Sequence, residues 1–355
     1  MKQVAVVCNY KLNPSRIGGM DRFFVAYDRK CKAQGCVVKW FFSGGKRFSF
    51  YKDLDIEICP DFSVENCFLN FQRKEKREFD FIVTHFVELC TSFFREVKNN
   101  GQPYIISVDH NPRPLNGFPI KKRLKNKLKG RLNSKYIDRF VGVSNYTRDQ
   151  ILNDYGHGLR SKTEVIYNGI DTGVYKKRTE ENFGKFIVAS HLRPSKGIQD
   201  LIHAVAILPT EFKNMIEIDI FGEGPMEQEL KEVVKNSNLM EHFNFKGSSP
   251  DLPDLFQHYS YMLQPTYMEC FSLSILESLA SNVPVITTPV GGNTEVIVAG
   301  QNGFIFEAGN VLELSKMIEE ILAKKKTISK PVHKVVEENY YLDKMVGDHA
   351  ALLNL

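Results

Sequence analysis

The chain has 355 residues, of which 43% are hydrophobic and 25% are charged, the composition of a globular protein long enough for two domains. No apolar run approaches the roughly 20 residues of a membrane-spanning helix, and the residues after Met1 lack the apolar core of a signal peptide. We therefore expect a cytoplasmic protein that does not span the membrane.

The net charge of +5 conceals a difference between the two halves of the chain. Residues 1–170 contain 30 Lys and Arg against 17 Asp and Glu, a balance of +13, whereas residues 171–355 contain 17 against 25, a balance of −8. This difference indicates two domains and predicts that the first faces an anionic partner.

The seven cysteines show no pattern typical of a metal site. Six of them lie within the first 90 residues, and none forms Cys-x-x-Cys or a Cys/His cluster with zinc spacing. We expect reduced, mostly buried thiols, as is usual in the cytoplasm.

The first strand is predicted at residues 3–9 and is followed by a loop that contains Gly18 and Gly19. A helix then extends to about residue 34. This arrangement suits a phosphate, because glycines let the backbone approach the anion and the helix N-terminus faces it. A plain tight turn between strand and helix is the alternative.

A histidine follows one of the next strands at a position where ligands commonly bind. Strands are predicted at residues 37–43, 79–86 and 103–108, whereas residues 44–78 are less regular. The third of these strands is followed by Asp109 and His110. Ligands of open α/β sheets bind at the carboxyl ends of strands, so His110 is a candidate and His85, at another strand end, a weaker one. The alternative for a histidine in this position is a structural hydrogen bond.

Residues 121–131 form a basic stretch with a thin apolar stripe. Its cations are Lys121, Lys122, Arg123, Lys125, Lys127, Lys129 and Arg131. Leu124, Leu128 and Leu132 recur every four residues, which predicts an amphipathic helix. Anionic lipid headgroups fit this pattern best. Nucleic acid is disfavoured because no aromatic residues are interleaved, and a solvated helix is the remaining alternative.

The first half closes with two more strands, at residues 139–143 and 163–167. Ser144 or Asn145 caps the helix between them, and Asn168-Gly169 is a turn signal after the second. Residues 172–184 are polar and without apolar periodicity, so we predict a linker there.

Glycines and cations follow the first strands of the second half. Its strands are predicted at residues 185–190, 216–221, 242–246, 261–263 and 283–288. The first strand leads into His191, Arg193 and Lys196-Gly197, and the second leads into a Gly222-Glu223-Gly224 turn. Arg193 and Lys196 suit a diphosphate, one as a planar fork and the other as a point charge. Exposed, solvated cations are the alternative.

The chain centres on residues 264–280, where Glu269 and Glu277 stand eight residues apart. A helix is predicted from about residue 271 to 281. Its N-terminus at Phe271-Ser272-Leu273 offers N–H groups that suit a phosphate. Glu277 falls on the polar side, with Ser274, Ser278 and Ser281, so it either faces a ligand or is a solvated carboxylate. Further helices are predicted at residues 310–324 and 331–353.

These glutamates, with Pro265-Thr266 before them and residues 284–295 after them, resemble the Glu-x7-Glu motif of retaining glycosyltransferases of family 4. The resemblance implies the GT-B fold, an α/β architecture of two doubly wound Rossmann-like domains facing across a cleft. It implies an acceptor-binding domain at 1–171, the linker at 172–184 and a nucleotide-sugar domain at 185–330. Residues 331–355 are then a C-terminal helix that crosses back to the first domain.

The resemblance also implies roles for individual residues, without a metal or other cofactor. Lys196 and Arg193 neutralise the leaving diphosphate, while Glu269 and His110 lie at the donor sugar. Glu277 holds the ribose of the donor. The other donor-binding residues are Gly18, Gly19, Asn168, His191, Gly222, Glu223, Gly224, Phe271, Ser272 and Leu273.

The implied activity is retaining transfer of a sugar from a UDP- or GDP-sugar to a hydroxyl of a saccharide or lipid-linked acceptor, in polysaccharide or lipopolysaccharide synthesis. The basic helix then places the protein on the anionic inner face of the membrane. An inactive nucleotide-sugar-binding partner is the alternative, because His191 stands where many family members carry Arg. The Glu-x7-Glu block disfavours the epimerases and phosphorylases that share the fold.

Overall fold

The computed structural model describes residues 1–60, 63–180 and 182–353. They form two compact units. Unit 1 comprises Met1–Asn168 together with the chain from Leu342 onward, and unit 2 comprises Gly169–Tyr341. Among the described residues, no helix combines the length and the apolar character needed to cross a bilayer.

Unit 1 is built on a parallel seven-stranded sheet with the order β3-β2-β1-β4-β5-β6-β7. The strands are β1 (Gln3–Leu12), β2 (Val37–Gly45), β3 (Asp55–Ile58), β4 (Phe81–His85), β5 (Tyr104–Asp109), β6 (Arg139–Gly142) and β7 (Thr163–Val165). Most central strands are near-continuous apolar runs, as expected where helices cover both faces of a sheet. Successive residues of β2 face opposite sides, since the Phe41 ring packs on Phe68 and the Phe42 ring on Phe24.

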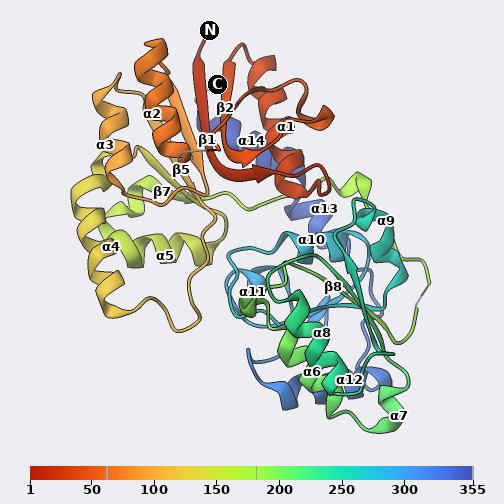
Figure 1. The fold of residues 1–355 in the computed structure, drawn as a ribbon. Coiled ribbons are helices and arrows are strands. Elements are labelled where there is room, and N and C mark those ends of the chain that lie inside the picture. Colours follow the sequence, from red (N-terminus) through yellow and green to blue (C-terminus); the bar gives the residue numbers. More distant parts are fainter. Residues whose placement is uncertain (61–62, 181, 354–355) are drawn as a thin grey trace. The chain divides into compact units, whose positions relative to one another are not determined.

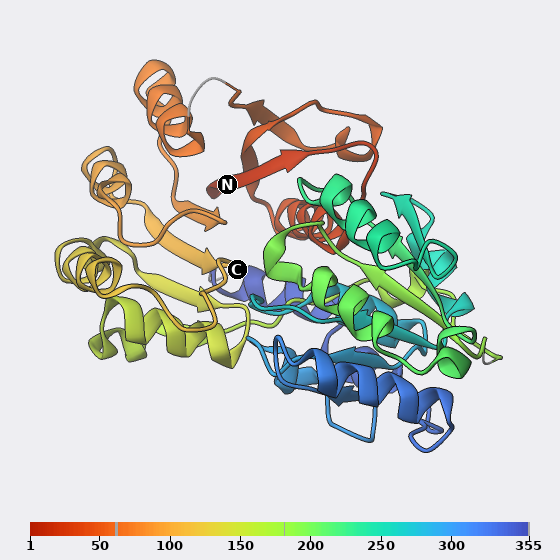
Figure 2. The ribbon, with the colours of Figure 1, turned by 60° about the horizontal axis from the view of Figure 1, so that its bottom comes forward.

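Helices cover both faces of this sheet (Figures 1 and 2). They are α1 (Gly19–Ala33), α2 (Val64–Glu75), α3 (Ser92–Asn99), α4 (Ile120–Asn133), α5 (Asn145–Tyr155) and α14 (Leu342–Ala351). The C-terminal helix α14 returns to pack on α1, where the His349 ring lies 5.0 Å from that of Phe23.

Unit 2 has a parallel six-stranded sheet with the order β10-β9-β8-β11-β12-β13. Its strands are β8 (Lys185–Ala189), β9 (Glu217–Phe221), β10 (Phe243–Gly247), β11 (Tyr261–Gln264), β12 (Val285–Thr287) and β13 (Gly303–Ile305). Its helices are α6 (Ile198–Ala206), α7 (Thr210–Lys213), α8 (Glu227–Asn236), α9 (Leu252–Leu255), α10 (Leu273–Ala280), α11 (Asn293–Val296), α12 (Val311–Leu322) and α13 (Lys334–Asn339). Both units are doubly wound, which confirms the predicted fold class.

The strand orders fix where ligands are expected in each unit. In unit 1 the chain reverses direction across the sheet between β1 and β4, and in unit 2 between β8 and β11. The loops that leave such neighbouring strands diverge to opposite faces and leave a crevice at the carboxyl ends. The loops after β1 and β4 and those after β8 and β11 are therefore the places to look for a site.

Three details differ from the sequence-based predictions. The region expected to be less regular contains β3 and α2, and Ser63 caps α2 by accepting a hydrogen bond from the Asn66 N–H at 3.3 Å. Cys59 and Cys67 form a disulfide, so the expectation of reduced thiols was wrong for these two, while the five remaining cysteines are buried and form no disulfide. The helix expected over 331–353 is two helices, α13 and α14, interrupted at Tyr340 and Tyr341.

Three buried histidines meet in the core of unit 1. The Nδ1 atom of His85 lies 3.0 Å from Nε2 of His110, and the His349 ring lies 5.8 Å from that of His85. Burial lowers the pKa of His110 to about 3 and that of His349 to about 4. Burial also lowers the pKa of His85, with smaller contributions from the other two imidazoles. The folded protein therefore holds all three in their neutral form at neutral pH.

This cluster predicts that acid destabilises the protein below about pH 6.5. The unfolded chain binds a proton at His349 near its ordinary pKa, whereas the folded protein resists protonation down to about pH 4. Unfolding free energies measured in urea at several pH values should fall as the pH decreases through this window. In His349→Leu the fall between pH 7 and pH 4 should be smaller by roughly 3 kcal/mol. Equal pH dependence of both proteins would contradict the prediction.

Candidate active site

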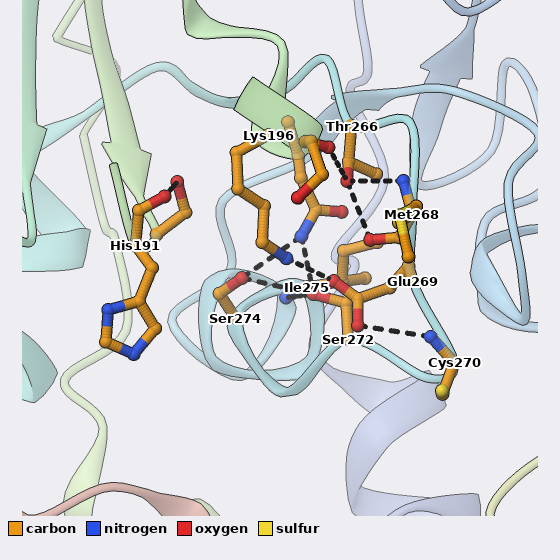
Figure 3. Close-up of polar contacts among 12 residues, drawn as sticks. His191, Lys196, Thr266, Met268, Glu269, Cys270, Ser272, Ser274 and Ile275 are labelled. Carbon is orange, nitrogen blue, oxygen red and sulfur yellow. Dashed lines mark hydrogen bonds and ion pairs between the residues drawn. The ribbon is translucent and has the colours of Figure 1, made fainter. Parts of the chain in front are cut away.

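An ion pair joins two of the predicted catalytic residues. Lys196 closes a short 3-10 turn after β8, and its Nζ atom lies 2.7 Å from Oε2 of Glu269 in the loop after β11 (Figure 3). The two side chains retain 20% and 17% of their exposure, so the pair is partly desolvated yet open on one side. The fold thus brings together charges that lie 73 residues apart in sequence, at the crevice given by the strand order.

Two glycines allow close backbone contact with the loop after β11, which carries Glu269. Gly197 lies in the loop after β8 and Gly291 in the loop after β12. Gly197 has a φ of +68°, and a Cβ atom there would lie 1.8 Å from the carbonyl oxygen of Pro265. Gly291 has a φ of +65°, and its Cβ would lie 2.1 Å from the carbonyl oxygen of Glu269. Only glycine combines this backbone conformation with such a close approach. The position of the ion pair therefore depends on both glycines.

The start of α10 lies next to the ion pair. Ser272 is the N-cap and accepts a hydrogen bond from the Ile275 N–H at 3.4 Å, and the Gln264 amide donates to its hydroxyl at 2.6 Å (Figure 3). The helix begins at Leu273, two residues after the predicted start. A helix offers no acceptor for its first N–H groups, here those of Leu273 and Ser274, so this end favours an anion.

The side of α10 that carries Glu277 does not face open solvent. Ser278 and Ser281 are fully buried, and the Ser278 hydroxyl donates to the carbonyl of Val283 at 2.8 Å. Glu277 itself is partly buried. The alternative of a fully solvated carboxylate is therefore not supported.

The Gly222–Gly224 turn packs against the loop after β8. The Nδ1 atom of His191 lies 3.3 Å from the carbonyl oxygen of Glu223, and a Cβ at Gly222 would lie 1.9 Å from the carbonyl oxygen of Ser190. Figure 3 shows the His191 ring apart from the Lys196 ammonium. The structure therefore assembles these predicted donor-binding residues into one loop cluster in unit 2.

Arg193 is exposed, and in the part of the chain that the structure describes its guanidinium forms no ion pair or hydrogen bond. It lies three residues before Lys196 on the same loop. The loop thus presents one cation fixed by a carboxylate and one that is solvated.

In unit 1, a buried carboxylate holds the predicted glycine loop. Asp21 is fully buried and accepts hydrogen bonds from the Gly18 N–H at 2.8 Å, from the Tyr10 hydroxyl at 2.9 Å and from the Tyr51 hydroxyl. Gly18 is the N-cap of α1, and Gly19 is its first residue. Sequence reasoning missed this role of Asp21, although an acidic residue three positions after a cap is the spacing of a capping box.

His110 stacks on a residue with an unusual backbone conformation. Its ring lies 4.2 Å from that of Phe86, which directly follows β4 and has a φ of +60°. A bulky side chain rarely adopts this left-handed conformation, and residues that do so cluster at functional sites. His110 is 9% exposed, with its Nε2 atom close to His85 Nδ1 as described above.

The loop after β5 is fixed by a second element that sequence reasoning missed. Arg113 forms buried ion pairs with Asp109 at 2.7 Å and with Asp154 of α5 at 2.8 Å. Another predicted donor-binding residue, Asn168, is the last residue of the first segment of unit 1. It is 4% exposed, and its Oδ1 atom has no hydrogen-bond partner among the described residues.

The cations of α4 do not all have the same surroundings. Lys122 and Lys129 pair with Glu88 at 3.1 and 2.8 Å. Burial acts to raise the pKa of Glu88, but hydrogen bonds from both lysines outweigh it and lower the pKa. The five cations with exposed side chains are Lys121, Arg123, Lys125, Lys127 and Arg131. The apolar row is also exposed, with 65% of Leu124 and 57% of Leu128 accessible.

Comparison with known families accounts for both units. The family described as Glycosyltransferase Family 4 matches residues 17–174, and the family described as Glycosyl transferases group 1 matches residues 174–339. The chain belongs to glycosyltransferase family 4.

Two curated relatives show how far the sequences of such proteins diverge from this chain. An uncharacterized glycosyltransferase of Methanocaldococcus jannaschii is 30% identical over 205 residues, which cover 56% of this chain and 55% of the relative. The N-acetyl-alpha-D-glucosaminyl L-malate synthase of Bacillus anthracis is 27% identical over 202 residues, which cover 53% and 52%. The matched part thus spans about half the length of these relatives.

The Anabaena protein HepE, solved in complex with UDP and glucose, shares the whole fold. It has a TM-score of 0.78 at 17% identity, covering 100% of this chain and 99% of the Anabaena chain. This similarity confirms the GT-B fold for this chain.

The close approach at Gly197 predicts a specific cost for adding a methyl group. Gly247 has nearly the same φ, +69°, but a Cβ there would meet nothing within 4 Å. Gly247→Ala should therefore lose only about 1 kcal/mol of unfolding free energy, from the left-handed backbone. Gly197→Ala should lose at least about 2 kcal/mol more, because the Pro265 carbonyl must move. Urea unfolding of both variants measures the difference, and equal losses would show that the contact is unimportant.

Proposed function

We propose that this protein is a retaining, metal-independent glycosyltransferase that moves a sugar from a UDP- or GDP-sugar to a hydroxyl of a saccharide or lipid-linked saccharide. The observation that carries the proposal is the Lys196–Glu269 ion pair at the start of α10. Family membership and the UDP bound to the Anabaena protein support a nucleotide-sugar donor.

The chemistry requires charge stabilisation at the leaving group. The bond between the anomeric carbon and the diphosphate breaks, and the acceptor oxygen forms the new bond on the same face. The departing phosphate takes the proton of the acceptor hydroxyl. Lys196 meets the negative charge that develops on the diphosphate, and the N–H groups at the start of α10 add a second positive end. Glu269 holds Lys196 in place beforehand, so little reorganisation is needed.

The remaining site residues receive supporting roles in this proposal. Arg193 supplies a second cation for the diphosphate, and its exposure leaves it free to turn toward an incoming anion. Glu269 also contacts hydroxyls of the donor sugar, and Glu277 holds the ribose. From unit 1, His110 positions the donor sugar. The Gly18–Gly19 loop contacts the phosphates through the Gly19 N–H, because the Gly18 N–H is held by Asp21.

The second candidate function is an inactive partner that binds a nucleotide-sugar within a glycosyltransferase complex. The observation in its favour is His191, which occupies a position where many family members carry Arg and whose ring lies apart from Lys196 (Figure 3). Turnover of the donor by the isolated protein would exclude it. Donor binding without turnover in any acceptor mixture would favour it.

We also propose a peripheral position on the inner face of the membrane, in the synthesis of a surface polysaccharide or lipopolysaccharide. Exposed leucines on α4 stand between exposed cations, the arrangement of helices that lie in the headgroup region of a bilayer. The net charge of +13 on residues 1–170 points to the same anionic surface.

Lys196→Ala should lose at least about 100-fold in transfer rate, because one preorganised charge at the leaving group is removed.

The donor class is read from the melting temperature of the protein with UDP-, GDP-, ADP- and TDP-sugars, with and without magnesium. A UDP- or GDP-sugar should raise the melting temperature of the wild type, since a ligand that binds only the folded state stabilises that state. The same sugar should raise it less in Lys196→Ala.

Lys231→Ala provides the matched control for this experiment. Lys231 also forms an ion pair in unit 2, with Glu227 at 2.6 Å, but on the exposed helix α8. Its removal should leave the transfer rate within about twofold, as surface ion pairs contribute little. Full activity in a folded Lys196→Ala variant would refute the catalytic assignment.

The membrane proposal predicts that two exposed leucines contribute to vesicle binding. Leu124→Ser combined with Leu128→Ser should weaken co-sedimentation with anionic vesicles about tenfold or more, because apolar area no longer enters the bilayer. Leu312→Ser is the control, since Leu312 is 74% exposed on α12 of unit 2. Unchanged binding of the double variant at physiological salt would reject insertion of α4.

A further inference from the structure

A hollow of about 440 Å³ lies in unit 1 beside the basic helix. It is bounded by α4, by the neighbouring α5 and by the loop after β5, with α4 and α5 side by side in Figure 1. None of the residues predicted from the family pattern to bind the donor lines it. A volume of this size suits a small organic ligand.

The wall formed by α4 carries two cations one helical turn apart, Arg123 and Lys127. Within the described ranges, neither side chain forms an ion pair or a hydrogen bond, in contrast to Lys122 and Lys129, which are held by Glu88. The carboxylate in the hollow, that of Asp154, is already bound by Arg113 at 2.8 Å. The lining thus has three cations, Arg113, Arg123 and Lys127, against this one carboxylate, which makes the hollow positive.

The opposite wall, apart from Asp154, is rich in hydrogen-bonding groups. Gln150, Asn153 and His157 line it from α5 and the turn that follows, and Asn116 lines it from the loop. Carboxamides both donate and accept hydrogen bonds, as hydroxyl groups require. Cations on one wall and carboxamides on the other match a ligand that has a phosphate and several hydroxyls.

The apolar row of α4 begins next to this hollow. At about 100° per residue, Ile120 and Leu124 follow Arg123 and Lys127 directly around the helix, away from the side that is buried against the protein. Ile120 is 72% exposed and Leu124 65% exposed. A ligand whose phosphate occupies the hollow would thus carry any attached hydrocarbon over this row.

We infer that the hollow between α4 and α5 is a phosphate-binding site for a phosphorylated, hydroxyl-bearing ligand. The inference rests on the proposed function in one respect, because it assigns the site to the phosphate of the acceptor. The shared chemistry comes from two sources, a lipid headgroup in the bilayer or a soluble sugar or polyol phosphate. Arg123 and Lys127 bind the phosphate, and the carboxamides bind the hydroxyls.

The experiment compares two charge-matched variants of the full chain by titration calorimetry with glycerol 3-phosphate. Arg123→Gln with Lys127→Gln should weaken binding about tenfold or more, because each cation loses a charge-assisted hydrogen bond. Lys121→Gln with Lys125→Gln removes the same charge from the same helix but outside the hollow, and should change binding less than about threefold. No binding to the wild type, or equal losses in both variants, would overturn the inference.

Vesicles of phosphatidylcholine with phosphatidylglycerol distinguish the two sources. Competition between these vesicles and glycerol 3-phosphate, lost in the Arg123 and Lys127 variant, identifies a lipid headgroup. Binding of glycerol 3-phosphate without such competition identifies a soluble phosphorylated ligand. The melting-temperature shift with UDP- or GDP-sugar is recorded in parallel, so that failure of the donor proposal is seen separately from failure of this site.

Discussion

The contact between the loops after β8 and β11 is the constraint on which the site in unit 2 depends. It places a lysine and a glutamate 2.7 Å apart at the edge of a parallel sheet. A partly desolvated ion pair is stable only where its geometry is good, because each charge loses solvation that the partner must replace. The backbone supplies that geometry. Gly197 lets the loop after β8, and Gly291 the loop after β12, approach the loop after β11 more closely than any side chain would allow.

The same ion pair explains how an anion site remains competent without its ligand. Lys196 is neither solvated and mobile nor buried and unpaired, because Glu269 holds its ammonium group in place. The ammonium group is therefore already in position when a diphosphate approaches the start of α10. It can then bind the diphosphate as well as the Glu269 carboxylate. Preorganised charge of this kind is the main contribution that a protein makes when a leaving group departs with negative charge.

In unit 1 the loops at the strand ends are held in place differently, by buried polar groups that are either neutral or fully hydrogen-bonded. Asp21 is satisfied by two phenols and the Gly18 N–H, and the clustered His85, His110 and His349 are kept neutral by burial. Phe86 accepts a left-handed backbone so that its ring can stack on His110. Stability is thus linked to pH through groups that lie at the candidate site.

The sequence predicted most of the fold because buried parallel strands are apolar runs and the glycine turns mark their ends. It did not predict β3 and α2, where short alternating and mixed-charge segments give weak periodicity, nor the disulfide of Cys59, since cysteine spacing alone does not determine pairing. The motif also pointed to Lys196 and Glu269, which the fold brings together in an ion pair. Asp21 and Arg113 were missed because their roles depend on partners that are distant in sequence.

Helix α4 shows most clearly why composition alone cannot assign function to charge. Its seven cations are indistinguishable in sequence, yet the fold divides them into three groups. Lys122 and Lys129 neutralise Glu88 and attach the helix to the protein. Arg123 and Lys127 line a hollow, and the others flank an exposed apolar row. The net charge of +13 on residues 1–170 predicts attraction to an anionic surface. Only the placement of each cation relative to its neighbours decides whether that cation anchors the helix, recognises a ligand or binds a membrane.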